Sequence, residues 1–248
     1  AEPVKAKATA VASRVDLKVI GAPRFLLIDE SINFKLAAKS KCFRHPFEDS
    51  MPKLGMEPIR KDALVKATIT EIGRTGSLDV TVSQIAKRAG MSSALAHHYF
   101  GSKEDMFLAA MRHIMTIYGA EVRGALGVAQ TPMARIEAIV VASFSAANFR
   151  REAVGAWLNF WVLAQTVPQA KRLVAVYQRR LKSNLLVGLR PLAGARAEAI
   201  AEGLGALIDG LYLREVLRPG APDGAAAAQM ARDYLAAHLA ATSLDING

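Results

Sequence analysis

Two groups of side chains in this sequence have types and spacings suited to binding chemistry. The first lies between residues 81 and 103, where small hydroxyl residues are followed by a histidine pair, a tyrosine and a lysine. On short helices such side chains hydrogen-bond to phosphate oxygens and to base edges in a DNA groove. The candidate DNA contacts are Thr81, Ser92, Ser93, Ala94, His97, His98, Tyr99 and Lys103. We expect Ser93 and Ala94 at base edges and Lys103 beside a phosphate.

The second group combines aromatic rings with one carboxylate. Trp157, Phe160 and Trp161 recur at i, i+3 and i+4, so they share one helix face. Asp209 and Tyr212 lie three residues apart in a later apolar run, where a buried carboxylate is costly unless it is paired. Aromatic rings and a carboxylate together suit a quaternary ammonium ion, which binds to ring faces. Two alternatives stay open, because the aromatic residues can be plain core and Asp209 can pair with an arginine at a domain interface.

A pair of short helices is expected to position the first group. Thr81 can cap a helix, with Gln84 completing a capping box, and Gly90 can end that helix with a positive φ. Ser92 then caps a second helix that runs to Phe100. The buried stripe of the first helix is Val82, Ile85 and Ala86, while Lys87 and Arg88 are expected to face water or phosphate. A generic helical hairpin is less favoured, because the second helix has too few apolar residues for a core helix.

These residues also carry a family resemblance. Ile85-Ala-x-x-Ala-Gly-Met-Ser92 and His98-Tyr-Phe-x-Ser-Lys-Glu104 resemble the DNA-binding domain of the TetR family of repressors. Ala94 replaces the usual glycine there, and His97 stands where tyrosine is frequent. The resemblance implies a helix-turn-helix that binds double-stranded operator DNA.

Four further segments resemble one branch of that family, the choline-responsive repressors of glycine betaine synthesis genes, over roughly residues 51 to 240. They are Met51–Met56, Ala156–Trp161, Arg179–Leu185 and Ala206–Arg214. Tyr212 replaces an expected tryptophan. Choline as a small cationic inducer is implied by this resemblance, since the residues themselves indicate only a cation with an apolar coat. A regulator of another system, such as efflux, that senses a different lipophilic cation is the first alternative.

Composition and charge are consistent with an all-α DNA-binding protein. The chain has 248 residues, a net charge of +10 and few alternating β-branched runs. The charge suits a polyanionic partner but is spread along the chain, so a non-specific basic DNA-binding protein is a second alternative. The single cysteine, Cys42, fits a reducing compartment. With no recognisable signal peptide and no apolar run of about 20 residues, we expect a cytoplasmic protein without a membrane partner.

Catalytic and metal-binding chemistry is not expected. His97 and His98 are adjacent, so on a helix their side chains diverge by about 100° and chelate poorly. No nucleophile elbow, phosphate-binding loop or dinucleotide fingerprint is present. We therefore expect neither an enzyme nor a cofactor.

The expected organisation is a poorly structured basic extension over residues 1–50, a three-helix DNA-binding domain over 51–104 and a helical ligand-binding and dimerisation domain over 105–242. Pro191 is expected to interrupt a long helix that begins at Pro168. The last two long helices are expected to form the interface of a homodimer as a four-helix bundle. The other helices are expected over 59–73, 103–124, 131–147, 150–165, 195–217 and 223–239.

Overall fold

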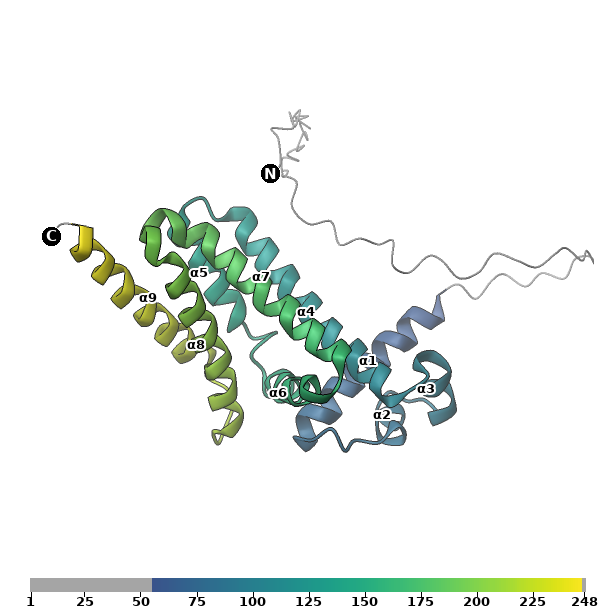
Figure 1. Ribbon diagram of the computed structural model, residues 1–248. Helices are drawn as coiled ribbons and strands as arrows, with labels where there is room; N and C mark the ends of the chain where they lie inside the picture. The colour runs from purple at the N-terminus through teal and green to yellow at the C-terminus, as the bar shows by residue number, and fades with distance from the viewer. Residues whose placement is uncertain (1–54, 247–248) are drawn as a thin grey trace, which may run out of the picture. The chain divides into compact units, whose positions relative to one another are not determined.

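A computed structural model describes residues 55–246, with side chains up to residue 241, and every regular element in that range is helical (Figure 1). The first four helices are α1 (Met56–Thr75), α2 (Val82–Arg88), α3 (Ser93–Phe100) and α4 (Lys103–Val128). They are followed by α5 (Pro132–Ser143), α6 (Arg151–Thr166), α7 (Pro168–Ala193), a short 3-10 turn at Gly194–Arg196, α8 (Ala197–Leu217) and α9 (Gly224–Ile246). The expected all-α class is confirmed.

Local capping sets the boundaries of the short helices. Thr81 accepts a hydrogen bond from the Gln84 amide at 3.2 Å while the Gln84 side chain accepts one from the Thr81 amide, so the predicted capping box is present. Gly90 has a φ of 69°, and Ser92 accepts from the Leu95 amide at 3.2 Å. These bonds satisfy amides that the first turn of a helix leaves without partners.

The long helices pack around one continuous core. Helix α7 lies against α5, α6 and α8, while α9 covers α8 and α5. Helices α2 and α3 are connected to this assembly through α1 and α4. Helix α1 packs against α6, and α4 packs against α5. Residues 55–246 lie within one compact unit, so the expected division near residue 104 falls inside a continuously packed region and stays a prediction.

Three expected helix boundaries were wrong. Helix α5 ends at Ser143 rather than near residue 147, because the Asn148 side chain donates to the Ala142 carbonyl at 2.9 Å and turns the chain. Helix α7 continues through Pro191 to Ala193. Pro191 lies in the last turn, where a missing amide costs only one hydrogen bond near the helix end. Helix α9 extends to Ile246, past the expected end at residue 239.

The prediction of a basic extension over residues 1–50 lies outside the described residues. In the part of the chain from 55 to 246, no helix is long and apolar enough to cross a membrane.

Candidate DNA-binding and ligand-binding sites

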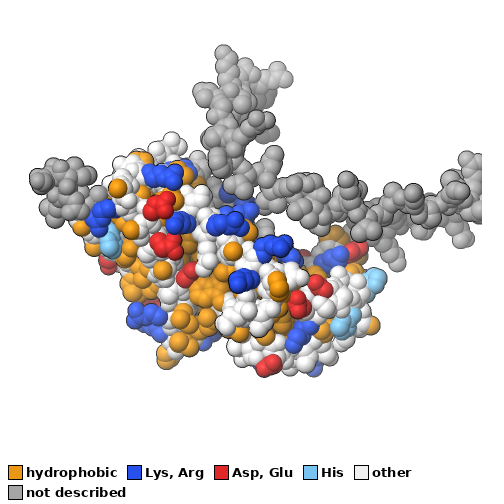
Figure 2. All heavy atoms as spheres, viewed as in Figure 1, with side chains coloured by type: hydrophobic (Ala, Val, Ile, Leu, Met, Phe, Trp, Pro, Cys, Tyr) orange, Lys and Arg blue, Asp and Glu red, His pale blue; other side chains and the backbone are white. Residues whose placement is uncertain are grey.

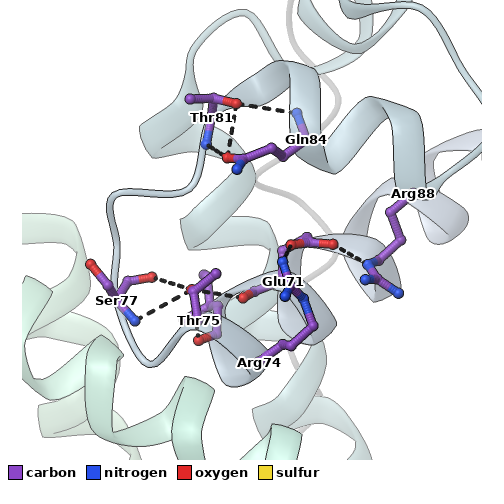
Figure 3. Close-up of polar contacts among 8 residues, drawn as sticks. Glu71, Arg74, Thr75, Ser77, Thr81, Gln84 and Arg88 are labelled. Atoms are coloured by element: carbon purple, nitrogen blue, oxygen red, sulfur yellow. Dashed lines mark hydrogen bonds and ion pairs between the residues drawn. The ribbon is translucent and has the colours of Figure 1, made fainter.

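A buried ion pair fixes the helix-turn-helix on α1. Glu71 of α1 is 4% exposed, and its carboxylate accepts hydrogen bonds from Arg88 of α2 and from Arg74, the latter at 3.1 Å (Figure 3). Burial by itself raises the pKa of Glu71, but the two arginines outweigh it and hold the pKa below its usual value. Arg88 is exposed, as expected, and it also binds a carboxylate of α1.

The predicted DNA contacts form a largely exposed surface on and beside α3. Ser92, Ala94, His97, His98 and Lys103 are exposed. In Figure 2 histidine side chains stand out on the end of the molecule that carries α2 and α3. Thr81 is also exposed, whereas Ser93 and Tyr99 are half-buried.

Three of these side chains are also held by neighbouring groups. The Tyr99 hydroxyl accepts from Arg60 at 3.3 Å, and His97 Nδ1 lies 2.9 Å from the Gly101 carbonyl oxygen. Lys103 Nζ donates to the Leu78 carbonyl at 3.1 Å. A fixed Lys103 ammonium at the start of α4 suits phosphate binding, and the contacts to DNA stay predictions.

Four aromatic rings from four helices meet around one cavity among the long helices. Tyr118 (α4), Trp157 (α6), Tyr177 (α7) and Tyr212 (α8) line one cavity, which we call the aromatic cage. The Tyr177 ring lies 4.9 Å from Trp157 and 5.8 Å from Tyr118, centroid to centroid, and both pairs are edge-on. Aromatic rings that line one cavity are the side chains that bind an organic cation.

The aromatic cage is small. Its free volume is about 20 Å³, which is room for about one water molecule. Ser143 and Asn148 supply polar groups to its lining, and the Tyr212 hydroxyl donates to the Ser143 carbonyl. A larger ligand would have to separate at least one of the contributing helices from the others.

Two carboxylates lie directly behind the cage walls. Asp209 Oδ1 accepts from the Tyr177 hydroxyl at 3.0 Å, and Glu121 Oε2 accepts from Asn148 Nδ2 at 2.6 Å. Within residues 55–241 no lysine or arginine forms an ion pair with either carboxylate. The region around the cage therefore carries negative charge without an ion-paired cation among the residues whose side chains are described.

Burial shifts the pKa values of the groups around the cage. Desolvation raises the pKa of Asp209 to about 6, although the hydrogen bond from Tyr177 opposes the shift. Desolvation raises the pKa of Tyr118 to about 12 and those of Tyr177 and Tyr212 well above the usual range. The tyrosines are therefore neutral at pH 7, and Asp209 is the group that titrates.

The structure separates the five predicted ligand residues. Trp157 and Tyr212 line the aromatic cage, and Asp209 lies behind it. Trp161 lines a different cavity, with Asp209, and Phe160 is fully buried and lines neither. The role of each in ligand binding stays a prediction.

Sequence reasoning missed two walls of the cage, Tyr118 and Tyr177. Each is a single tyrosine on the apolar face of a long helix, and a search for buried hydroxyls on such faces would have found both. No group of three or more potential metal ligands occurs within the described range.

A close helix crossing connects the two sites. A Cβ atom built on Gly73 of α1 would lie 2.4 Å from the carbonyl oxygen of Glu152 on α6, so only glycine fits there. Gly155 of α6 faces the same point and is two residues from Trp157. Helix α1 also carries Glu71, which holds α2. The cage and the DNA-binding helices are thus joined by two rigid elements in direct backbone contact.

Comparison with known proteins gives matches over both sites. A family model for bacterial regulatory proteins of the tetR family matches residues 64–110, and a model for the C-terminal domain of BetI-type transcriptional repressors matches residues 132–240. The HTH-type transcriptional regulator BetI of Brucella suis (strain ATCC 23445 / NCTC 10510) is 52% identical over 190 residues, covering 76% of this chain and 96% of the relative. The protein of the same name from Rhizobium meliloti (strain 1021) is 48% identical over 192 residues, covering 77% and 95%.

Solved structures share the fold. A transcriptional regulator from Pseudomonas aeruginosa PAO1 is 27% identical with a TM-score of 0.64, covering 74% of this chain and 91% of that one. A transcriptional regulator from Saccharomonospora viridis, solved in complex with choline, is 20% identical with a TM-score of 0.62, covering 72% and 96%. At that identity the second likeness shows the fold alone.

Proposed function

Since this chain belongs to the TetR family of transcriptional regulators and has a BetI-type C-terminal domain, we propose that it is a repressor that choline releases from its operator. The genes it controls in this proposal are those of glycine betaine synthesis. As a TetR-family repressor it is a DNA-binding regulator and not an enzyme. The ligand and the regulated genes are the parts that need an experiment.

The observation that carries the choline proposal is the aromatic cage with its two carboxylates. A trimethylammonium group donates no strong hydrogen bond, so its binding depends on ring faces and nearby negative charge. The cage supplies Tyr118, Trp157, Tyr177 and Tyr212 as rings, with Asp209 and Glu121 behind them. The names of the curated relatives and the choline complex of a structure with the same fold support the choice of choline.

Release from DNA follows from the size of the cage. A trimethylammonium group is larger than water, so it must widen a cavity of about 20 Å³. If widening moves α6 relative to its neighbours, the movement reaches α1, because α6 crosses α1 in backbone contact at Gly73. The widened conformer binds choline and the closed conformer binds operator, so the difference in choline affinity between the two conformers sets the extent of release.

The proposal includes a homodimer built through α8 and α9. Leu213, Leu217 and Met230 leave large apolar side chains exposed on these two helices. Pairing them with a second copy would form a four-helix bundle and bury those side chains. Two DNA-binding heads would then meet a near-palindromic operator in successive major grooves.

A titration of the full-length chain with labelled DNA from upstream of glycine betaine synthesis genes tests the proposal. We expect fluorescence anisotropy to show tight binding to this DNA and its loss on adding choline, but not on adding glycerol, which has hydroxyls and no charge. Release by tetramethylammonium without release by choline would show that the inducer is a quaternary ammonium ion other than choline. No release by either cation would reject the cage as the inducer site.

A further inference from the structure

A second cavity lies next to the aromatic cage and shares a hydrogen bond with it. This outer pocket is lined by Trp161 and Ala164 of α6, Val174 and Gln178 of α7, and Ala206 and Asp209 of α8. Asp209, an outer-pocket residue, accepts the hydrogen bond of Tyr177, a cage residue. The rings of Trp161 and Trp157, one in each cavity, lie 6.3 Å apart.

The two cavities differ in size and access. The outer pocket has about 330 Å³ of free space and is open to solvent, which is within the size range of small-molecule sites. The aromatic cage has about 20 Å³ and is more enclosed. An organic cation that arrives from solvent can therefore enter the outer pocket without any rearrangement, whereas it can enter the cage only after a wall moves.

The lining of the outer pocket has the chemistry that an organic cation needs. The Trp161 indole offers a ring face, Asp209 a carboxylate, and Ala164, Val174 and Ala206 an apolar surface for methyl groups. Only Oδ1 of Asp209 is occupied, by Tyr177, so its second oxygen lacks a hydrogen-bond partner among the described residues. Gln178 adds an amide that can bind a hydroxyl or carbonyl at the other end of the ligand.

We propose that the outer pocket is a separate binding site for a small quaternary ammonium ion, which is occupied first and from which the ion passes into the aromatic cage. This inference rests on the proposed function, since it assigns the entry route to the same inducer. A cation beside Asp209 competes for the charge that holds the Tyr177 hydroxyl. The weaker Tyr177–Asp209 hydrogen bond then allows Tyr177 to swing aside and admit the ion.

The two tryptophans of the chain allow each cavity to be observed separately. In Trp157→Phe, Trp161 is the remaining indole and reports on the outer pocket; in Trp161→Phe, Trp157 reports on the cage. Stopped-flow mixing with choline should give Trp161 a fast phase whose amplitude saturates with choline. Trp157 should show only a slower phase whose rate levels off at high choline. A single phase, with one rate that rises linearly with choline in both variants, would overturn the outer site.

A blocking variant tests whether the outer pocket lies on the route. Val174→Phe fills the pocket from α7, and Ala175→Phe places the same ring on the next residue of α7, which is exposed and does not line the pocket. With Val174→Phe we expect the slow phase of entry to be at least about fivefold slower, and with Ala175→Phe to be unchanged. Equal rates in the two variants would overturn the route.

The same experiments separate this inference from the proposed function. If choline releases DNA but enters in one phase, the outer site is wrong and the repressor proposal stands. If choline neither changes the fluorescence nor releases DNA, both proposals are rejected.

Discussion

Gly73 and Gly155 face each other where α1 crosses α6, and a Cβ atom built on Gly155 would lie 3.2 Å from the Cα atom of Gly73. The absence of both side chains lets two helix backbones meet. One of these helices positions the DNA-binding head through Glu71, and the other carries Trp157 of the aromatic cage. A movement of α6 on ligand binding therefore reaches α1 without passing through flexible side chains.

We expect Gly73→Ala to destabilise the protein, because the added methyl group would meet the Glu152 backbone and force α1 away from α6. Overpacking of this kind costs about 1–3 kcal/mol. Operator affinity without choline should fall as well, since α1 carries the head. Thermal unfolding and anisotropy measure the two effects.

The matched control is Gly124→Ala in α4, an exposed helical glycine with open space around its Cβ position. There alanine should be neutral or stabilising, by up to about 1 kcal/mol. A Gly73→Ala protein that melts as high as the Gly124→Ala protein would refute the close crossing.

Asp209→Asn should make the ligand-free protein more stable and its choline binding weaker. The carboxylate is desolvated and has no cationic partner among residues 55–241, whereas the amide keeps an oxygen for Tyr177 and carries no charge. We expect a gain of about 1–2 kcal/mol at pH 7. If Asp209 only stabilises the core, the variant should instead melt at a lower temperature than the wild type. Calorimetry with and without choline distinguishes the two outcomes.

Choline affinity should depend on pH through Asp209. Its pKa in the folded protein is raised to about 6, so the stability linked to this group is full below its unfolded pKa near 4 and is lost as pH rises through 6. Choline binding has the opposite sign, because it needs the ionised form, and should weaken as pH falls below about 6. Titrations from pH 5 to 8 should show this dependence in the wild type, and its persistence in Asp209→Asn would assign it to another group.

Arg88→Ala should unfold the DNA-binding head more easily, since it leaves the buried Glu71 carboxylate with Arg74 as its remaining partner. Removing one partner of a buried ion pair lowers the free energy of unfolding by about 3–5 kcal/mol. We expect a smaller loss here, because Arg74 still pairs with Glu71. Lys87→Ala is the control, because Lys87 is an exposed neighbour on the same helix. Identical melting curves for the two variants would contradict a stabilising role of the Arg88–Glu71 ion pair.

Lys103→Ala should weaken binding to operator and to unrelated DNA by a similar factor. A phosphate contact carries no base information, and losing one should reduce the slope of log affinity against log salt by about 1. Ala94→Leu should instead change base preference, because Ala94 is exposed at the start of α3. Footprints on a series of mutated operators compare the two, and a base-dependent loss with Lys103→Ala would contradict the phosphate assignment.

The sequence by itself determined the features that depend on neighbours along the chain. The capping box of Thr81 and Gln84, the positive φ of Gly90 and the cap at Ser92 are formed by residues within about four positions of one another. Such bonds depend on local geometry, so residue types and spacing are enough to predict them. The family could be identified from the same short segments.

Only the tertiary structure decided which side chains meet. Trp157 and Trp161 share a helix face, yet they line different cavities because α7 and α8 contribute different residues to each. Tyr118 and Tyr177 are 59 positions apart, and the exposed Arg88 also binds a carboxylate 17 positions earlier. Packing between helices distant in the sequence sets these contacts, and helical periodicity shows which face of a helix is buried but not which residues cover it.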